Sequence, residues 1–233
     1  MRPVFSKVIY AMWIITFTVM PVCTRDSVTE NTSDPFTIHN LGVAFGPYNA
    51  STGLAGDFLF VRNRRKVFLE FGAVVSDGQG GTKALPTFEY LLRKDAWITA
   101  IADGEVVRFA YQEDTQDYEF GVQSTQNENY DVGYDHVLNP RVGPGDLIHA
   151  GDTLGNPGTW DSQLGRFEIM INNNASGYSC CPFCVFDPAV SAMYEQQVLD
   201  LIRDWEAFKG DQTIYDEESH TRYGCTMDSM ITY

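Results

Sequence analysis

The four cysteines near the C-terminus are the residues whose spacing first suggests chemistry. They are Cys180, Cys181, Cys184 and Cys225, and Cys181-Pro-Phe-Cys184 forms a C-x-x-C motif. Such a group can form disulfides, bind structural zinc or carry redox-active thiols. Redox motifs of this type lie at a helix N-terminus within a βαβ pattern, which is not seen here, and a four-cysteine zinc site generally has a second closely spaced pair. We therefore expect disulfides that tie Cys225 to the 180–184 segment, with zinc and free thiols as the alternatives.

The N-terminus has the features of an export signal, which would place these cysteines in an oxidising compartment. Two basic residues precede an apolar run from Val8 to Val22, which is short for a membrane span. We expect residues 1–23 to be a signal peptide and residues 24–35 a polar linker. Cys23 stands where a lipoprotein signal places its lipidated cysteine, although Met20-Pro-Val22 matches poorly the small residues that precede such a cysteine. The protein is expected in the periplasm, at the cell surface or in the medium, with a lipoprotein or a retained anchor as alternatives.

The chain is strongly acidic, with 31 Asp+Glu against 16 Lys+Arg and a net charge of −15. A nucleic-acid groove or an anionic membrane surface needs positive potential, so neither is an expected partner. Hydrophobic residues make up 44% of the sequence and aromatic residues 13%, which is enough for a folded core. The acidity indicates solubility, or attraction of cations or of a basic partner.

Glycine-rich signatures and one histidine mark the middle of the chain. Ala102-Asp-Gly104 is followed by Tyr134-Asp-His136, by Gly145-Asp-Leu-Ile-His-Ala-Gly-Asp-Thr-Leu-Gly155 and by Gly165-Arg-Phe-Glu-Ile169. In this order, over roughly residues 85–190, the segments resemble the lysostaphin/LytM-type zinc metallopeptidases, which cut peptidoglycan cross-bridges. Biotinyl and lipoyl carrier barrels share the two glycine signatures, but they present a lysine between them, and none lies there in this chain.

The resemblance implies a zinc site, and most of its ligand positions hold residues that cannot bind a metal. The family's H-x-x-x-D motif falls on Leu85 and Glu89, and its H-x-H motif falls on Leu164 and Arg166. Leucine offers no ligand atom, and a guanidinium is permanently charged and repels a dication. Of the family's two catalytic histidines, one matches His136 and the other matches Leu164. Glu89 is the one matched ligand position that still offers a ligand atom, so we expect no zinc cofactor here.

A binding groove formed by Glu89, His136 and Arg166 is expected in place of the zinc centre. Two roles are open to Arg166: it pairs internally with Glu89, or it grips the carboxylate of an acidic peptide or glycan end with a two-pronged hydrogen bond. The other histidines do not supply the missing ligands, since His149 is expected at the surface and the rest lie outside the matched stretch.

The function that the resemblance implies is a non-catalytic, exported domain that acts in binding or regulation at the cell envelope. Its expected partner is peptidoglycan or an envelope hydrolase, with no catalytic small-molecule substrate. The alternatives are an active zinc metalloendopeptidase with unconventional ligands and an exported structural or interaction domain unrelated to peptidoglycan. Zinc analysis separates the active peptidase from the other two functions, and a peptidoglycan pull-down separates the non-catalytic envelope domain from the domain unrelated to peptidoglycan.

Short apolar runs separated by Gly, Pro and Asn indicate strands through most of the chain. We expect an N-terminal β extension over residues 36–84, the degenerate peptidase-like domain over 85–190, and a helix with a cysteine-tethered tail over 191–233. Asp187-Pro188 predicts the N-cap and first position of the helix, and Gly210 predicts its end. Between them apolar residues recur at spacings of three and four, which predicts a buried helix face: Val190, Tyr194, Val198, Leu201, Trp205 and Phe208. The predicted fold is mainly β, a small β-sandwich or barrel of the LytM peptidase type with added N-terminal strands and one C-terminal helix.

Overall fold

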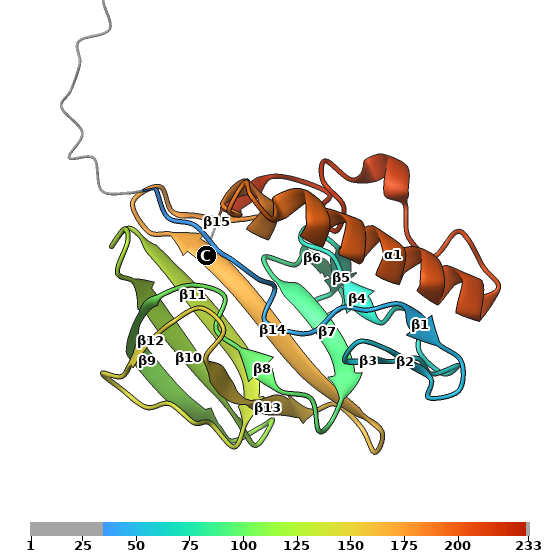
Figure 1. Ribbon diagram of the computed structural model, residues 1–233, viewed down its shortest axis with the longest axis horizontal. Coiled ribbons are helices and arrows are strands. Elements are labelled where there is room, and N and C mark those ends of the chain that lie inside the picture. Colours follow the sequence, from blue (N-terminus) through green and yellow to red (C-terminus); the bar gives the residue numbers. More distant parts are fainter. Residues whose placement is uncertain (1–34, 232–233) are drawn as a thin grey trace, which may run out of the picture. The chain divides into compact units, whose positions relative to one another are not determined.

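The computed structural model describes residues 35–231, so the expected signal peptide, Cys23 and nearly all of the expected linker lie outside the described residues (Figure 1). This part of the chain contains many strands, one α-helix and two short 3-10 helices. The elements are β1 Tyr48–Asn49, β2 Leu54–Ala55, β3 Phe58–Leu59, β4 Phe68–Leu69, β5 Val74–Ser76, β6 Thr82–Ala84, β7 Phe88–Arg93, β8 Ile98–Thr99, β9 Gly104–Gln112, β10 Asp117–Ser124, β11 Tyr130–Leu138, β12 Leu147–Ile148, β13 Thr153–Thr159, β14 Leu164–Asn173, β15 Tyr178–Cys180, η1 Pro182–Cys184, α1 Ser191–Lys209, η2 Glu217–Ser219 and β16 Ser229–Ile231.

Most strands join one large antiparallel sheet. Its order is β1-β2-β3-β7-β14-β13-β11-β10-β9-β12, with β4 on β7, β8 on β13, β15 on β14 and β16 on β15. β5 and β6 form a separate two-stranded hairpin around the glycine-rich turn that the sequence indicates. The fold is mainly β with one C-terminal α-helix, as predicted. Within residues 35–231 the sheet stays open, because its path ends at β1 and β12 without closing into a barrel.

Strand β14 is the centre of the sheet. It pairs with β7 from Leu164 to Ile169 and with β11 from Glu168 to Asn173. Its core side chain Phe167 lies 5.9 Å, ring centre to ring centre, from Tyr90 of β7. Because successive side chains of a strand point to opposite faces, Arg166 and Glu168 project from the face opposite Phe167. The apolar residues on either side thus fix the direction of the charged ones.

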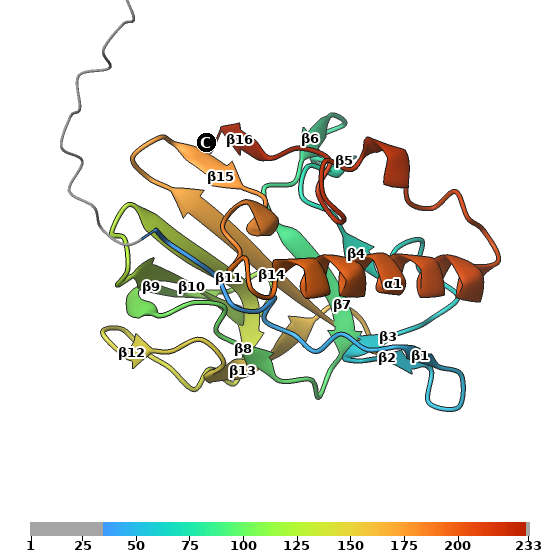
Figure 2. The same cartoon turned by 45° about the horizontal axis from the view of Figure 1, so that its top comes forward.

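Helix α1 lies over the part of the sheet that contains β4 and β7 (Figures 1 and 2). Its residues Val198, Leu201 and Trp205 are buried, as the spacing of apolar residues predicts. Gly210 ends the helix in the left-handed conformation with φ 71°, also as predicted. The helix begins at Ser191, however, three residues after Pro188, because Asp187 forms a turn in which its backbone oxygen accepts a bond from the Ser191 N–H. Among the described residues, no helix is both long and apolar enough to span a membrane.

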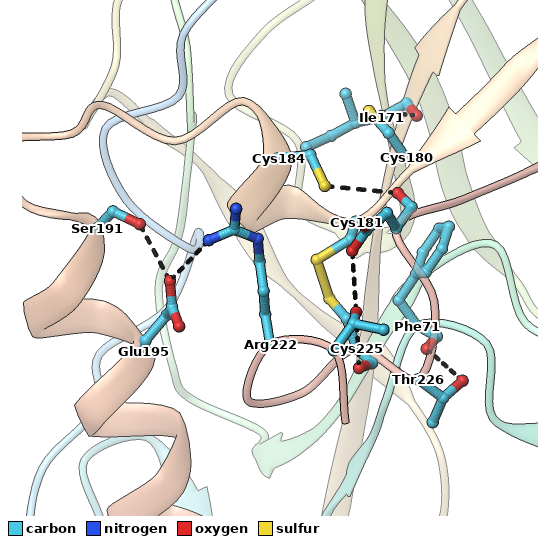
Figure 3. The surroundings of a disulfide bond; sticks show 12 residues. Phe71, Ile171, Cys180, Cys181, Cys184, Ser191, Glu195, Arg222, Cys225 and Thr226 are labelled. Atoms are coloured by element: carbon cyan, nitrogen blue, oxygen red, sulfur yellow. Dashed lines mark hydrogen bonds and ion pairs between the residues drawn. A yellow bond between two sulfur atoms is a disulfide. The ribbon is translucent and has the colours of Figure 1, made fainter. Parts of the chain in front are cut away.

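A disulfide joins Cys181 to Cys225 and fastens the C-terminal tail to the segment after β15 (Figure 3). Both sulfurs belong to fully buried residues. Arg222 adds an ion pair to Glu195 of α1 at 3.3 Å, so the tail also contacts the helix. The predicted link between the tail and the 180–184 segment is therefore present. Cys180 and Cys184 remain free thiols, so one of the two expected disulfides is formed.

The free thiols lie in surroundings that disfavour the reactive thiolate. Burial, and then the nearby Cys184, raises the pKa of Cys180 to about 12. Burial, and then the Asp228 carboxylate, raises the pKa of Cys184 as well. Thiolate is the nucleophile and the metal ligand, so these surroundings favour the less reactive, protonated form of both groups.

Candidate functional site

Two carboxylates and a guanidinium form a charged centre where β7 meets β14. The strand register places Glu89 directly opposite Glu168, and Arg166 lies diagonally across from Glu89. Like charges directly opposite one another destabilise a sheet unless a cation compensates them. Arg166 does so: its Nε donates to Glu89 Oε1 at 2.9 Å, and its Nη2 donates to Glu168 Oε1. The Arg166–Glu89 ion pair inferred from the sequence is present.

Burial makes this arrangement electrostatically demanding. Glu89 is 4% exposed and Glu168 is 8% exposed. Burial, followed by the Glu168 carboxylate, raises the pKa of Glu89, and Arg166 and His136 offset only part of that rise. Burial alone would lower the pKa of Arg166, but the Glu168 and Glu89 carboxylates outweigh it and raise that pKa. Arg166, which is permanently charged, thus compensates the charge of two buried carboxylates.

A second charged centre adjoins the first, where β10 meets β11. His136 Nδ1 lies 2.9 Å from Asp117 Oδ2, and Thr115 Oγ1 donates to Asp117 Oδ1 at 2.5 Å. The other ring nitrogen, Nε2, lies 3.6 Å from Asp135 Oδ2 and 3.7 Å from Glu168 Oε1. His136 therefore connects the two centres, with one nitrogen on Asp117 and the other facing the carboxylates.

The backbone at His136 departs from regular strand geometry. Its φ is 60°, which is uncommon for any residue with a side chain. The β10–β11 register shifts between Tyr118 and Phe120, which marks a β-bulge at this point. Bulges redirect side chains and are frequent beside functional sites. The bulge brings both Asp135 and His136 toward the charged face.

Gly158 separates the two centres. In the β13–β14 register it lies opposite Arg166, and a Cβ at this position would come within 2.4 Å of Asp117 Oδ2 and 2.9 Å of the His136 Cβ. Only a residue without a side chain allows His136 and Asp117 to pack so closely against β13. The sequence analysis identified Glu89, His136 and Arg166 but missed Asp117, Asp135 and Glu168.

The residues matched to the family's zinc ligands do not form a zinc site. Leu85, at a ligand position, follows β6 and is 5% exposed, and Leu164, at the position of a catalytic histidine, is 1% exposed and packs in the core. Neither side chain has a donor atom, and Arg166 places a fixed positive charge between the acids. The zinc that the resemblance implies therefore does not fit at Glu89 and Arg166.

The described residues do contain one group that could hold a metal ion elsewhere. Single ligand atoms of Asp117, Asp135 and His136 lie within 4.8 Å of one another. Two carboxylates and an imidazole suit zinc or another divalent cation.

The remaining histidines lie away from these centres. His149, with its side chain 77% exposed, faces Asp103 at 3.6 Å, in keeping with the expected surface position. His39 lies 3.3 Å from Asp187. His220, expected in a polar tail, instead has a buried ring 3.6 Å from Glu70. The tail is thus better packed than its composition indicates.

A hollow of about 730 Å³ opens beside the first centre. Glu89 and Leu91 of β7 line it, together with Trp160 and the loop residues 64–66. The Arg166 guanidinium lies 5.2 Å from the Trp160 ring centre, a cation–π distance. Glu89 and Trp160, which both contact Arg166, therefore form part of the wall of a cavity large enough for a small ligand.

Comparison with solved structures finds peptidases of the class that the motifs resemble. The chain is similar to the catalytic domain of the antimicrobial peptidase lysostaphin from Staphylococcus simulans, with a TM-score of 0.40 and 16% identity over 49% of this chain and 86% of that one. For a zinc-containing peptidase from Vibrio cholerae the TM-score is 0.40, with 12% identity over 60% of this chain and 37% of that one. For Csd3 from Helicobacter pylori it is 0.41, with 10% identity over 85% of this chain and 48% of that one.

These likenesses are partial. The chain spans less than half of the latter two proteins, and at such TM-scores the matches carry no argument about the site. No known family profile matches the chain, and no curated protein matches it. The function must be argued from the geometry of the residues themselves.

Proposed function

We propose that this protein is an exported, non-catalytic peptidase-like domain that binds peptide material of the cell envelope in the hollow beside Glu89. The observation that carries the proposal is the Arg166 guanidinium, which bonds to Glu89 and Glu168 at the position where the resemblance places a zinc ligand. A hydrolytic zinc needs three protein ligands and an open position. Here an internal cation takes up the carboxylate charge instead, and the hollow remains accessible for binding.

Because Arg166 is bonded to two internal carboxylates, its main role in this proposal is to hold the floor of the hollow. The disulfide at Cys181 supports export, since such bonds persist in oxidising compartments. Peptidoglycan is the proposed partner, and an envelope hydrolase docked at the same hollow is the regulatory version of the same function.

The test uses purified protein, purified peptidoglycan and elemental analysis. We expect the protein to sediment with peptidoglycan, to release no soluble fragments from it and to contain far less than one zinc per chain. Release of fragments would overturn the non-catalytic assignment. Protein that stays in the supernatant would overturn envelope binding.

A second candidate, an active zinc peptidase with unconventional ligands, is favoured by the group of Asp117, Asp135 and His136. These three residues reach the number of protein ligands that a hydrolytic zinc needs. Under this alternative the protein would bind about one zinc, and Asp135→Asn would remove it. Zinc that persists in Asp135→Asn but is lost in Cys184→Ser would instead locate the metal at the cysteines.

A further inference from the structure

The loop between β3 and β4 concentrates positive charge in a strongly acidic chain. Its sequence Arg62-Asn-Arg-Arg-Lys66 contains four cationic side chains in five residues, whereas the chain as a whole has 16 Lys+Arg and a net charge of −15. Cations this close repel one another, so their grouping needs a compensating interaction. Acidic residues of the fold compensate two of these cations and leave the other two available to a ligand.

Helix α1 holds the backbone of this loop in place. Lys209 Nζ donates to the carbonyl oxygens of Arg62 and Arg64, each at 2.7 Å. Trp205 Nε1 donates to the carbonyl oxygen of Arg65 at 2.9 Å. Three anchor points on the end of a packed helix fix the directions from which the side chains project, and fixed donors lose less entropy when they bind a ligand.

Two of the four cations are compensated internally. Arg64 pairs with Asp161, and this bond lowers the pKa of Asp161 to about 2. Lys66 Nζ lies 2.8 Å from Glu70 Oε1. These two side chains are therefore committed to the fold.

The other two cations, Arg62 and Arg65, have donors to spare. Within residues 35–231 neither side chain makes an ion pair or a side-chain hydrogen bond. Arg62 lies over the Phe208 ring, 4.1 Å from its centre, and Arg65 is exposed. Stacking on a ring uses the face of a guanidinium and leaves the N–H groups at its edge free.

These side chains line a small hollow of about 350 Å³. Arg62, Arg65 and Lys209 contribute positive charge, and Asp211 is the one acid in its lining. The larger hollow described above adjoins it, because both are lined by Arg64, Arg65, Thr213 and Ile214. From there the larger hollow runs past apolar Leu69 and Leu91 to Glu89.

We propose that the small hollow binds the terminal carboxylate of a short peptide whose preceding residues lie in the larger hollow. This inference rests on the proposed function for its class of ligand, a peptide. Guanidinium edges match a carboxylate with two parallel hydrogen bonds. A multiply charged ligand such as a polyphosphate is disfavoured, because Asp216 lines the adjoining hollow and the cations Arg64 and Lys66 there are already paired with Asp161 and Glu70. A single carboxylate followed by a neutral backbone suits both hollows.

The test compares three probes: tri-alanine, tri-alanine amide and inorganic phosphate. Binding is followed by nuclear magnetic resonance, including the arginine Nε–Hε signals. We expect tri-alanine to bind roughly tenfold or more tightly than its amide, the difference that charge-assisted hydrogen bonds produce. Arg65→Gln and Arg62→Gln should each reduce that preference, and Lys94→Gln, an exposed cation outside the hollows, should leave it unchanged.

Equal affinity for the acid and the amide, or no binding of either, overturns the carboxylate site even if the protein sediments with peptidoglycan. Phosphate binding as tight as that of tri-alanine also overturns it, because the loop would then be a general anion patch. If the protein binds tri-alanine more tightly than its amide but does not sediment with peptidoglycan, only the proposal of envelope binding is overturned. The failures of the two proposals are therefore distinguishable.

Discussion

The two charged centres that meet at Glu168 compensate buried acids in different ways. At β7–β14 the cation is Arg166, which is always charged and is bonded to both Glu89 and Glu168. At β10–β11 the partner of Asp117 is the imidazole of His136, whose other ring nitrogen lies 3.6 Å from Asp135 Oδ2. The first centre is closed by its own cation. The second centre has two carboxylates, Asp117 and Asp135, and, within the described residues, no internal arginine bonded to them, so it is the better candidate for binding an external cation.

The largest expected effect comes from removing the internal cation. Arg166→Met should leave Glu89 and Glu168 buried without a partner and lower the free energy of unfolding by about 3–5 kcal/mol. Urea denaturation measures the loss. Arg108→Met is the control, because Arg108 is half exposed and lies 3.6 Å from Glu119. A loss below about 1 kcal/mol for Arg166→Met would show that the first centre does not depend on its arginine.

A methyl group between the centres should affect the second more than the first. Gly158→Ala places a Cβ within 2.4 Å of Asp117 Oδ2 and should destabilise the fold by about 2–3 kcal/mol through overpacking. The imidazole N–H resonance of His136 bonded to Asp117 should shift or disappear, while the Arg166 Nε–Hε signal stays. Gly143→Ala is the control, because a Cβ there would meet its nearest atom, Asp146 Oδ2, at 3.9 Å. An unchanged imidazole resonance would contradict the predicted close approach.

Loss of the hydroxyl that supports Asp117 should have a smaller effect. Thr115→Val removes the donor to a carboxylate that is 1% exposed and should cost about 1–2 kcal/mol of stability. Thr115→Ser keeps the hydroxyl and should retain most of it. Thermal unfolding of the two variants side by side provides the measurement, and a loss for Thr115→Val no larger than that for Thr115→Ser would show that the hydrogen bond contributes no more than the methyl group.

The smallest effect is a change in pH dependence. Burial, and then the Glu168 carboxylate, raises the folded-state pKa of Glu89 above its ordinary value of 4.5, so the folded protein retains a proton there that the unfolded chain releases. The contribution of Glu89 to the free energy of unfolding therefore falls as pH rises from 4.5 through the folded-state pKa. Glu89→Gln should remove this downward contribution, whereas Glu105→Gln, on an exposed residue, should not. Identical pH profiles for wild type and Glu89→Gln would contradict it.

The sequence predicts those parts of the molecule that local patterns determine. Apolar alternation identifies the strands around Phe167, the spacing of Val198, Leu201 and Trp205 identifies the buried face of α1, and Gly210 marks its end. The Arg166–Glu89 pair also follows from the sequence, because the motif resemblance brings two distant strands together. Short-range signals thus suffice where a residue's role depends on its neighbours in the chain.

What the sequence does not predict depends on pairings between distant residues. Asp117 is 19 residues from His136, and only the bulge between β10 and β11 brings their side chains together. Glu168 is placed beside Glu89 by strand register, which a one-residue shift would reverse. The start of α1 differs because Asp187 closes a turn before the helix, an arrangement that uses the same residue type as an N-cap.

The disulfide between Cys181 and Cys225 has a consequence for the lifetime of the protein among proteases. The covalent ring it closes contains all of α1 and the exposed residues 211–213 that follow Gly210. A single cut in that segment would leave both fragments in one particle, since the bond still joins them. Separation would require both a cut and a reductant, so a nicked molecule would retain its helix and run as two bands only on a reducing gel.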